Sequence, residues 1–146
     1  MFDGLASAFI DAIGEIMRPA GDLAEQRDRG EDSVRLAIAA LLTHVAHVDG
    51  VLHDKETAAL ETMLAERFSL GETAARQLIA SARRADGEAN DFSAFASEVK
   101  RRLDAAGRAR VIAMMWAVAR ADGEVHEFEE ALIERVARLL AVDAGA

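Results

Sequence analysis

The chain has 146 residues, of which 51% are hydrophobic, and this is enough for one domain with a real core. It contains no cysteine, which excludes disulfides, thiolate catalysis and cysteine-based zinc sites and fits a cytoplasmic location. The 26 acidic and 17 basic residues give a formal net charge of −9, which repels phosphate backbones and anionic lipid headgroups. We therefore expect no nucleic-acid partner and no membrane-surface contact.

The first 32 residues predict a helix followed by a linker. Large apolar side chains recur three or four apart over residues 1–18, which predicts an amphipathic helix that the Arg18-Pro19 pair should end. Acids stand where a secretory signal would carry positive charge, so no signal peptide is expected. We expect this helix to contact its own bundle, a second subunit or another protein. Residues 19–32 are charged and nearly free of large apolar side chains, and they predict a charged linker.

The rest of the chain predicts helices throughout, because it is rich in Ala, Leu, Glu and Arg and holds a single Pro in all. No apolar run approaches the roughly 20 residues that span a bilayer, so no transmembrane segment is predicted. We expect an all-α compact bundle of about six to seven helices, with its body at 33–142 and a flexible tail at 143–146. Its apolar stripes are Val34, Ile38, Leu41, Leu42 and Val45; Leu60, Met63, Leu64 and Phe68; Ala75, Leu78, Ile79 and Ala82; Phe92, Phe95, Ala96, Val99 and Leu103; residues 111–119; and Ile133, Val136, Ala137 and Leu140.

Short signals predict where these helices begin and end. An Asp-Gly pair at 49–50 and another at 86–87 each indicate the end of a helix. The tetrapeptide Ser-Leu-Gly-Glu at 69–72 matches a capping box, in which the Ser hydroxyl and the Glu carboxylate satisfy free backbone N–H groups. Asp91 is expected to cap the following helix, and Gly107 is expected to precede the most apolar one.

The phrase Asp-Gly-x-x-His-x-x-Glu occurs twice, at 49–56 and at 122–129, an offset of 122 − 49 = 73 residues. The same offset aligns the apolar stripe around Leu60 with the one around Ile133. Each copy is therefore a helix, a turn and a second helix, and two such hairpins packed face to face would bury both stripes. The pentapeptide Arg-Ala-Asp-Gly-Glu occurs at 84–88 and again at 120–124, but the copy at 84–88 has Asn90 and Ser93 where the other has His126 and Glu129. We therefore interpret the Asp-Gly pair at 86–87 as a helix stop alone.

Three segments resemble the TerB-like tellurite-resistance family: AHVDGVLHDKETAALETMLAERFSL at 46–70, NDFSAFASEVKRRLD at 90–104 and WAVARADGEVHEFEEALIERVARLLAV at 116–142. The resemblance covers residues 34–142. It implies an all-helical bundle built from a duplicated hairpin, with an acidic surface that holds divalent metal. Relatives often have Asp at the position of His53, commonly followed by Pro, whereas this chain has His-Asp.

The repeated phrase has two interpretations. In the first, its polar residues bind a divalent cation such as Ca²⁺, Mg²⁺, Mn²⁺ or Zn²⁺; these residues are Asp49, His53, Glu56, Asp122, His126 and Glu129. In the second, which we favour because such caps are common, the His caps the next helix and the Glu returns to the cap N–H. Asp49 and Asp122 lie at the negative end of a helix dipole, so each needs backbone amides or an ion beside it.

His44 and His47 lie three apart on one predicted helix, a spacing that also suits metal ligands. The second copy has Ala117 and Arg120 at these positions. We interpret the two histidines as partly buried surface residues, because paired ligands usually come with a supporting carboxylate.

Two classes of function remain open. The first is a non-catalytic module in a stress or tellurite-resistance system, acting through a protein partner or self-association and with no certain cofactor. The second is a metal-assisted hydrolase or another small metalloenzyme that uses the Asp, His and Glu turns, which needs an open metal position. A carboxylate-bridged di-iron site is disfavoured because His-x-x-Glu runs in the reverse order here. A structural domain without a ligand is the simplest case.

Overall fold

The computed structural model describes residues 23–48, 54–88, 92–121 and 123–142, and all structural statements below refer to these ranges. They form the helices α2 (Leu23–Ala46), α3 (Asp54–Phe68), α4 (Glu72–Glu88), α5 (Ser93–Arg102), α6 (Ala105–Ala119) and α7 (Glu127–Leu139). No strand occurs within the described ranges. The predicted all-α fold is confirmed; the helix predicted at 1–18 and the tail at 143–146 lie outside the described residues.

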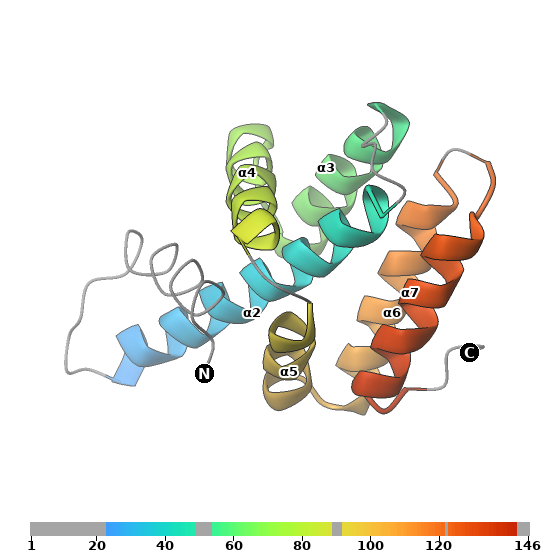
Figure 1. Cartoon of the computed structure of the whole chain (residues 1–146). Coiled ribbons are helices and arrows are strands. Elements are labelled where there is room, and N and C mark those ends of the chain that lie inside the picture. The colour runs from blue at the N-terminus through green and yellow to red at the C-terminus, as the bar shows by residue number, and fades with distance from the viewer. Residues whose placement is uncertain (1–22, 49–53, 89–91, 122, 143–146) are drawn as a thin grey trace.

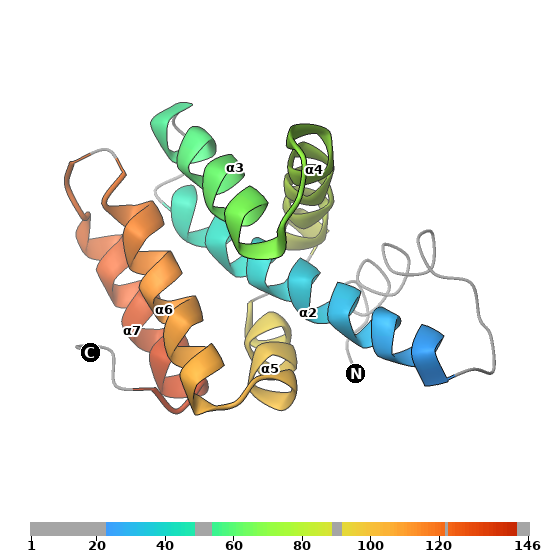
Figure 2. The same cartoon turned by 180° about the vertical axis from the view of Figure 1, so that it is seen from behind.

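Helix α2 is the axis of the bundle and contacts each of the other five described helices. In both views α3 and α4 lie on one side of α2, α5 lies on the opposite side, and the antiparallel pair α6 and α7 flanks its C-terminal half (Figures 1 and 2). Every residue from Leu36 to Leu42 is at most 4% exposed. Contact on several sides explains why this stretch is apolar all round rather than along one stripe.

The burial pattern supports the predicted duplication. Leu60 and Ile133, which the 73-residue offset aligns, are both 0% exposed, and Glu56 and Glu129 are both 2% exposed. The two hairpins, α2 with α3 and α6 with α7, pack against each other through α2 and α6. Equivalent positions of the two copies therefore face one shared core.

The linker predicted at 19–32 is wrong from residue 23 onward, because α2 already begins at Leu23. Residues 23–32 consist largely of Leu, Ala, Glu, Gln, Arg and Asp, and most of these are good helix formers whatever their charge. Gly30 and Ser33 are already buried, so α2 packs against the bundle at these two positions without large apolar side chains. A shortage of apolar residues was thus no sign of a loop.

The capping box predicted at residues 69–72 is also wrong. Helix α4 begins at Glu72, so Gly71 and not Ser69 immediately precedes it. Ser69 adopts a left-handed φ of 54° just after α3, and the next N–H, that of Leu70, donates to the Ala65 carbonyl at 2.9 Å. Ser69 therefore belongs to the C-terminal end of α3.

Two further helix starts differ in detail from the prediction. Helix α6 begins at Ala105, and the Asp104 carboxylate accepts a hydrogen bond from the N–H of Gly107 at 2.8 Å. Gly107 thus lies in the first turn of α6 and does not precede it. Helix α5 begins at Ser93, and Asp91, the predicted cap, lies outside the described residues.

A polar cluster around the buried Glu98 joins α5 to α2. We call Ser33, Glu98, Arg101 and Arg102 the Glu98 cluster. Glu98 is 6% exposed and accepts a 2.7 Å hydrogen bond from the Ser33 hydroxyl of α2. Arg102 donates to it at 2.9 Å, and Arg101 also pairs with it. Burial raises the pKa of Glu98, but the bonds from Ser33, Arg101 and Arg102 outweigh burial and hold the pKa below its ordinary value of 4.5.

Candidate functional site

The second copy of the repeated phrase forms a helix start. Helix α7 begins at Glu127, with His126 at the N-cap position. The Glu129 carboxylate accepts a hydrogen bond from the backbone N–H of His126 at 2.9 Å, and His126 itself is exposed. This is the returning half of a capping box, as the helix-capping interpretation predicts.

The first copy is described in part. Glu56 lies in the first turn of α3 and is buried, like its counterpart Glu129. A carboxylate in the first turn also meets the positive end of the helix dipole. Asp49, His53 and Asp122 lie outside the described residues. Cation binding by the six residues of the repeated phrase therefore stays a prediction.

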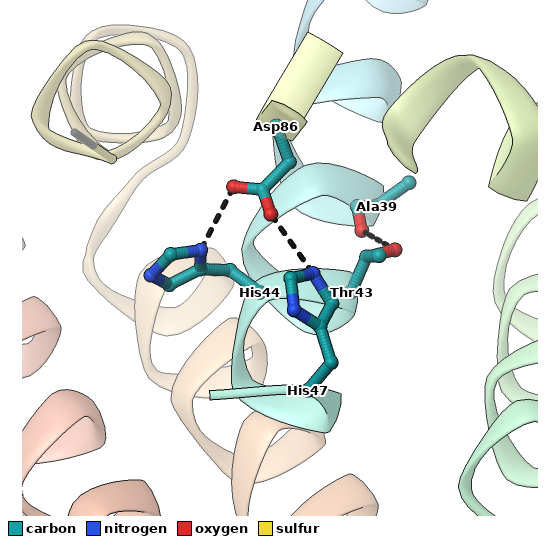
Figure 3. Close-up of polar contacts among 5 residues, drawn as sticks. All are labelled: Ala39, Thr43, His44, His47 and Asp86. Atoms are coloured by element: carbon teal, nitrogen blue, oxygen red, sulfur yellow. Dashed lines mark hydrogen bonds and ion pairs between the residues drawn. The ribbon is translucent and has the colours of Figure 1, made fainter. Parts of the chain in front are cut away.

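A different polar cluster joins the end of α2 to the end of α4 (Figure 3). The Nδ1 atom of His44 lies 2.8 Å from one carboxylate oxygen of Asp86, and the Nε2 atom of His47 lies 3.0 Å from the other. One carboxylate thus bridges two imidazole rings. We call His44, His47 and Asp86 the His-His-Asp cluster.

The helices bring these three side chains together for simple geometric reasons. His44 lies in the last turn of α2 and His47 directly follows it, and both rings point toward Asp86 of α4 (Figure 3). On α4, Ala82 and Ala85 are 0% and 1% exposed, and such small side chains let the two helix backbones approach closely. Asp86 follows directly and reaches across to both rings.

Burial is uneven within the cluster. The Asp86 side chain is 5% exposed, whereas the His44 and His47 side chains are 29% and 34% exposed. The ring of Phe92 also packs against His44, with centroids 5.5 Å apart. The carboxylate thus forms the floor of the cluster, and the imidazoles form its solvent-facing side.

The pKa values follow from these contacts. Burial raises the pKa of Asp86, but the hydrogen bonds with His44 and His47 outweigh it and hold the pKa below its ordinary value of 3.8. The hydrogen bond with Asp86 raises the pKa of His47 above 6.5, against burial and the nearby charge of Arg83. The carboxylate is therefore ionised at neutral pH.

Asp86 is the site residue that the sequence analysis misses. Its Asp-Gly pair lies in the last turn of α4, which ends at Glu88, so the pair does mark the end of a helix. It is not a stop signal alone, because Asp86 is buried there and contacts both histidines. The signal that reveals it is helical phase: Ala75, Ile79, Ala82 and Asp86 follow one another at spacings of four, three and four, and all four residues are buried. Asp86 also supplies the carboxylate that the sequence interpretation found lacking beside His44 and His47.

The His-His-Asp cluster has the composition of a metal-ligand set. Its ligand atoms all lie within 4.8 Å of one another, and no other group of three or more His, Asp or Glu residues meets this condition in the part of the chain that the structure describes. Within the same part, no helix has both the length and the apolar character needed to cross a membrane.

The described residues define an all-helical module made from two related hairpins with α4 and α5 between them. The family model for the Tellurite resistance protein TerB matches residues 35–146, and the chain belongs to that family. This confirms the family resemblance seen in the sequence. No curated protein and no solved structure matches the chain.

Proposed function

We propose that this chain is a non-catalytic TerB module that binds a protein partner in a cytoplasmic stress or metal-resistance system. Membership of the TerB family over residues 35–146 supports the kind of module. The main support for the proposal is Phe128, which lies in the first turn of α7 and is 63% exposed. Aromatic residues such as Phe are enriched in the buried core of protein–protein interfaces.

The surroundings of Phe128 define the chemistry of the proposed partner. The first turn of α7 carries the acids Glu127, Glu129 and Glu130, of which Glu129 is buried and Glu127 and Glu130 are exposed. Phe128 thus lies in the same helical turn as two exposed carboxylates. A partner for this surface would offer an apolar pocket rimmed with basic groups.

The capping bond supports a binding role for the same turn. Because the Glu129 carboxylate holds the His126 N–H at 2.9 Å, the backbone that carries Phe128 is fixed before any partner arrives. A preordered contact residue loses less conformational entropy on binding. The repeated phrase then acts as an ordered turn that holds Phe128 in place for a partner protein.

A photo-reactive phenylalanine analogue at position 128 tests the proposal in the cell that makes this protein. We expect a discrete cross-linked product with one protein, identified by mass spectrometry. The matched control places the same analogue at Lys100, which is also exposed but lies on α5. An excess of unlabelled chain should abolish the product at 128, and an excess of the Phe128→Asp variant should leave it intact.

Two outcomes would contradict the proposal. One is the absence of any specific product at position 128, and the other is the same set of products at positions 100 and 128. A product formed with a second copy of this chain identifies self-association as the contact, and sedimentation of the wild type and the Phe128→Asp variant then measures it.

A further inference from the structure

We propose that His44, His47 and Asp86 form a binding site for a divalent late transition-metal ion, with Zn²⁺ as its representative. This site is separate from the repeated turns and does not depend on the protein contact proposed above. Three features support this site: the ligand chemistry of the three residues, their spacing, and the absence of such residues from the second copy of the repeat.

The ligand set selects the class of metal. Two imidazole nitrogens and one carboxylate oxygen suit Zn²⁺, Co²⁺ or Ni²⁺, whereas Ca²⁺ and Mg²⁺ prefer oxygen ligands throughout. His44, in the last turn of α2, offers Nδ1, and His47, the first residue after α2, offers Nε2. Asp86 offers one oxygen to each ring. Three protein ligands leave at least one position on the ion for water or another ligand.

The spacing needs small adjustments to accept an ion. Two ligand atoms about 2.1 Å from a tetrahedral Zn²⁺ lie about 3.4 Å apart. The two nitrogen-to-oxygen distances are 2.8 and 3.0 Å, and all the ligand atoms lie within 4.8 Å of one another. An ion between the rings and the carboxylate therefore lengthens the two hydrogen-bonded distances by about half an ångström and draws the ring nitrogens in.

The cluster has room for this adjustment. The His44 and His47 side chains are 29% and 34% exposed, so their rings can rotate without opening the core. The Asp86 carboxylate, at 5% exposed, is the fixed member. An ion that enters from the solvent side replaces the hydrogen bonds between the rings and the carboxylate with coordination bonds to the same atoms.

The second copy shows that this cluster is not a requirement of the hairpin. Ala117 and Arg120 occupy the positions equivalent to His44 and His47, and the guanidinium of Arg120 lies over the ring of Trp116 at 5.2 Å from its centroid. The hairpin therefore folds with an arginine at this place. The first copy alone combines two imidazoles with a buried carboxylate, as a ligand site requires.

The experiment compares the full chain with four variants after treatment with a chelator. His47→Arg keeps a hydrogen-bond donor for Asp86, and the second copy already carries Arg there, but a guanidinium has no lone pair for a metal. Asp86→Asn removes the anionic ligand and changes little in shape. Glu98→Gln alters another buried carboxylate that contacts α2, and His126→Ala removes an exposed imidazole of the repeated turns, so both serve as controls.

Titration calorimetry with Zn²⁺, Co²⁺, Mg²⁺ and Ca²⁺ gives the affinities, and circular dichroism checks that each variant is folded. We expect the wild type and both controls to bind one Zn²⁺ per chain with equal affinity and to prefer it to Mg²⁺ and Ca²⁺. We expect His47→Arg and Asp86→Asn to bind Zn²⁺ at least about tenfold more weakly, because direct ligands matter no less than the outer partners of a metal site. The Co²⁺ complex should show visible bands that His47→Arg loses.

Three results would overturn the proposal. The first is a wild type that binds no Zn²⁺, or that prefers Mg²⁺ or Ca²⁺. The second is unchanged Zn²⁺ affinity in both His47→Arg and Asp86→Asn, and the third is a loss of affinity confined to His126→Ala, which would place the ion at the repeated turns. If His47→Arg does not fold, His44→Ala takes its place beside Asp86→Asn.

Discussion

Asp86 and Glu98 are two buried carboxylates that contact α2 about three turns apart, and they differ in the partners that neutralise them. Their residues are 9% and 6% exposed, and burial opposes the charge of both. Glu98 is held by a hydroxyl and two guanidinium groups, and a guanidinium carries no lone pair that a metal can use. Asp86 is held by two imidazoles, which can exchange a proton for a metal ion.

Burial of an acid does not by itself indicate a metal-binding site. The Glu98 cluster is complete, because permanent cations and a hydroxyl already satisfy the carboxylate. The His-His-Asp cluster keeps ligand atoms of the kind that zinc proteins use. The chemistry of the partner groups, and not the depth of the acid, separates a structural contact from a candidate binding site.

The largest expected effect is at Glu98. The variant Glu98→Gln loses the charge that Arg101 and Arg102 share, and hydrogen bonds to charged groups contribute about 1.5–3 kcal/mol. We expect the free energy of unfolding, measured by urea denaturation at pH 7, to fall by about 2 kcal/mol. A change within experimental error would show that the cluster is only a solvated surface contact, and Glu98 would then no longer serve as the example of a buried acid with a structural role.

The pH dependence of that loss tests its cause. The folded-state pKa of Glu98 lies below 4.5, so its charge stabilises the fold fully above pH 4.5, and this contribution is lost as the pH falls through the folded pKa. We expect a constant gap between wild type and Glu98→Gln at neutral and mildly acidic pH, and a shrinking gap in more acidic solution. A gap that stays constant in acid would point to packing instead of charge.

A smaller effect is expected at Asp86 in chelator-treated protein. Asp86→Asn retains a side chain of the same shape and loses the charge that attracts the two rings, at a cost of about 1.5 kcal/mol, the lower end of the contribution of hydrogen bonds to charged groups. Thermal unfolding in the presence of a chelator measures it. A loss greater than that of Glu98→Gln would reverse the ranking and make Asp86 the stronger structural residue.

The smallest effect is expected at Gly30, where α2 meets the Glu98 cluster. A Cβ at this position would lie 2.6 Å from an Arg102 terminal nitrogen, which belongs to a side chain that is 42% exposed and can move. Alanine also favours a helix over glycine by about 1 kcal/mol. We expect Gly30→Ala to change the free energy of unfolding by less than about 0.5 kcal/mol, because the two effects oppose each other. A loss several times larger would show that Arg102 is held rigidly.

The sequence predicts the fold well, because apolar spacing reports directly on which side of a helix is buried. The stripe of Leu60 and Leu64 and the stripe of Ile133 and Val136 all reach the core; each of these residues is 0% exposed. The start of α2 escapes prediction, because buried Gly30 and Ser33 leave no apolar signal. Whether such a segment is helical depends on helix propensity and on its contacts with the rest of the bundle, and not on how many apolar residues it contains.

The candidate metal site is harder to predict, because it depends on a contact between helices. His47 and Asp86 lie 39 positions apart, and nothing local indicates that they meet. The Asp-Gly pair at 86–87 resembles a helix stop, and this local signal conceals the helical phase that buries Asp86. The Glu129 cap, by contrast, is local and follows directly from the spacing of the repeated phrase.

The central position of α2 has a consequence for how the protein unfolds. Because α2 contacts each of the other five described helices, none of them can separate from it without exposing part of its apolar surface. The amides of its buried middle, from Leu36 to Leu42, should therefore exchange with solvent only through opening of the whole module. An ion that joins α2 to α4 would slow this exchange across the entire protein and not only beside the site, so hydrogen exchange of the α2 amides would report metal binding at a distance.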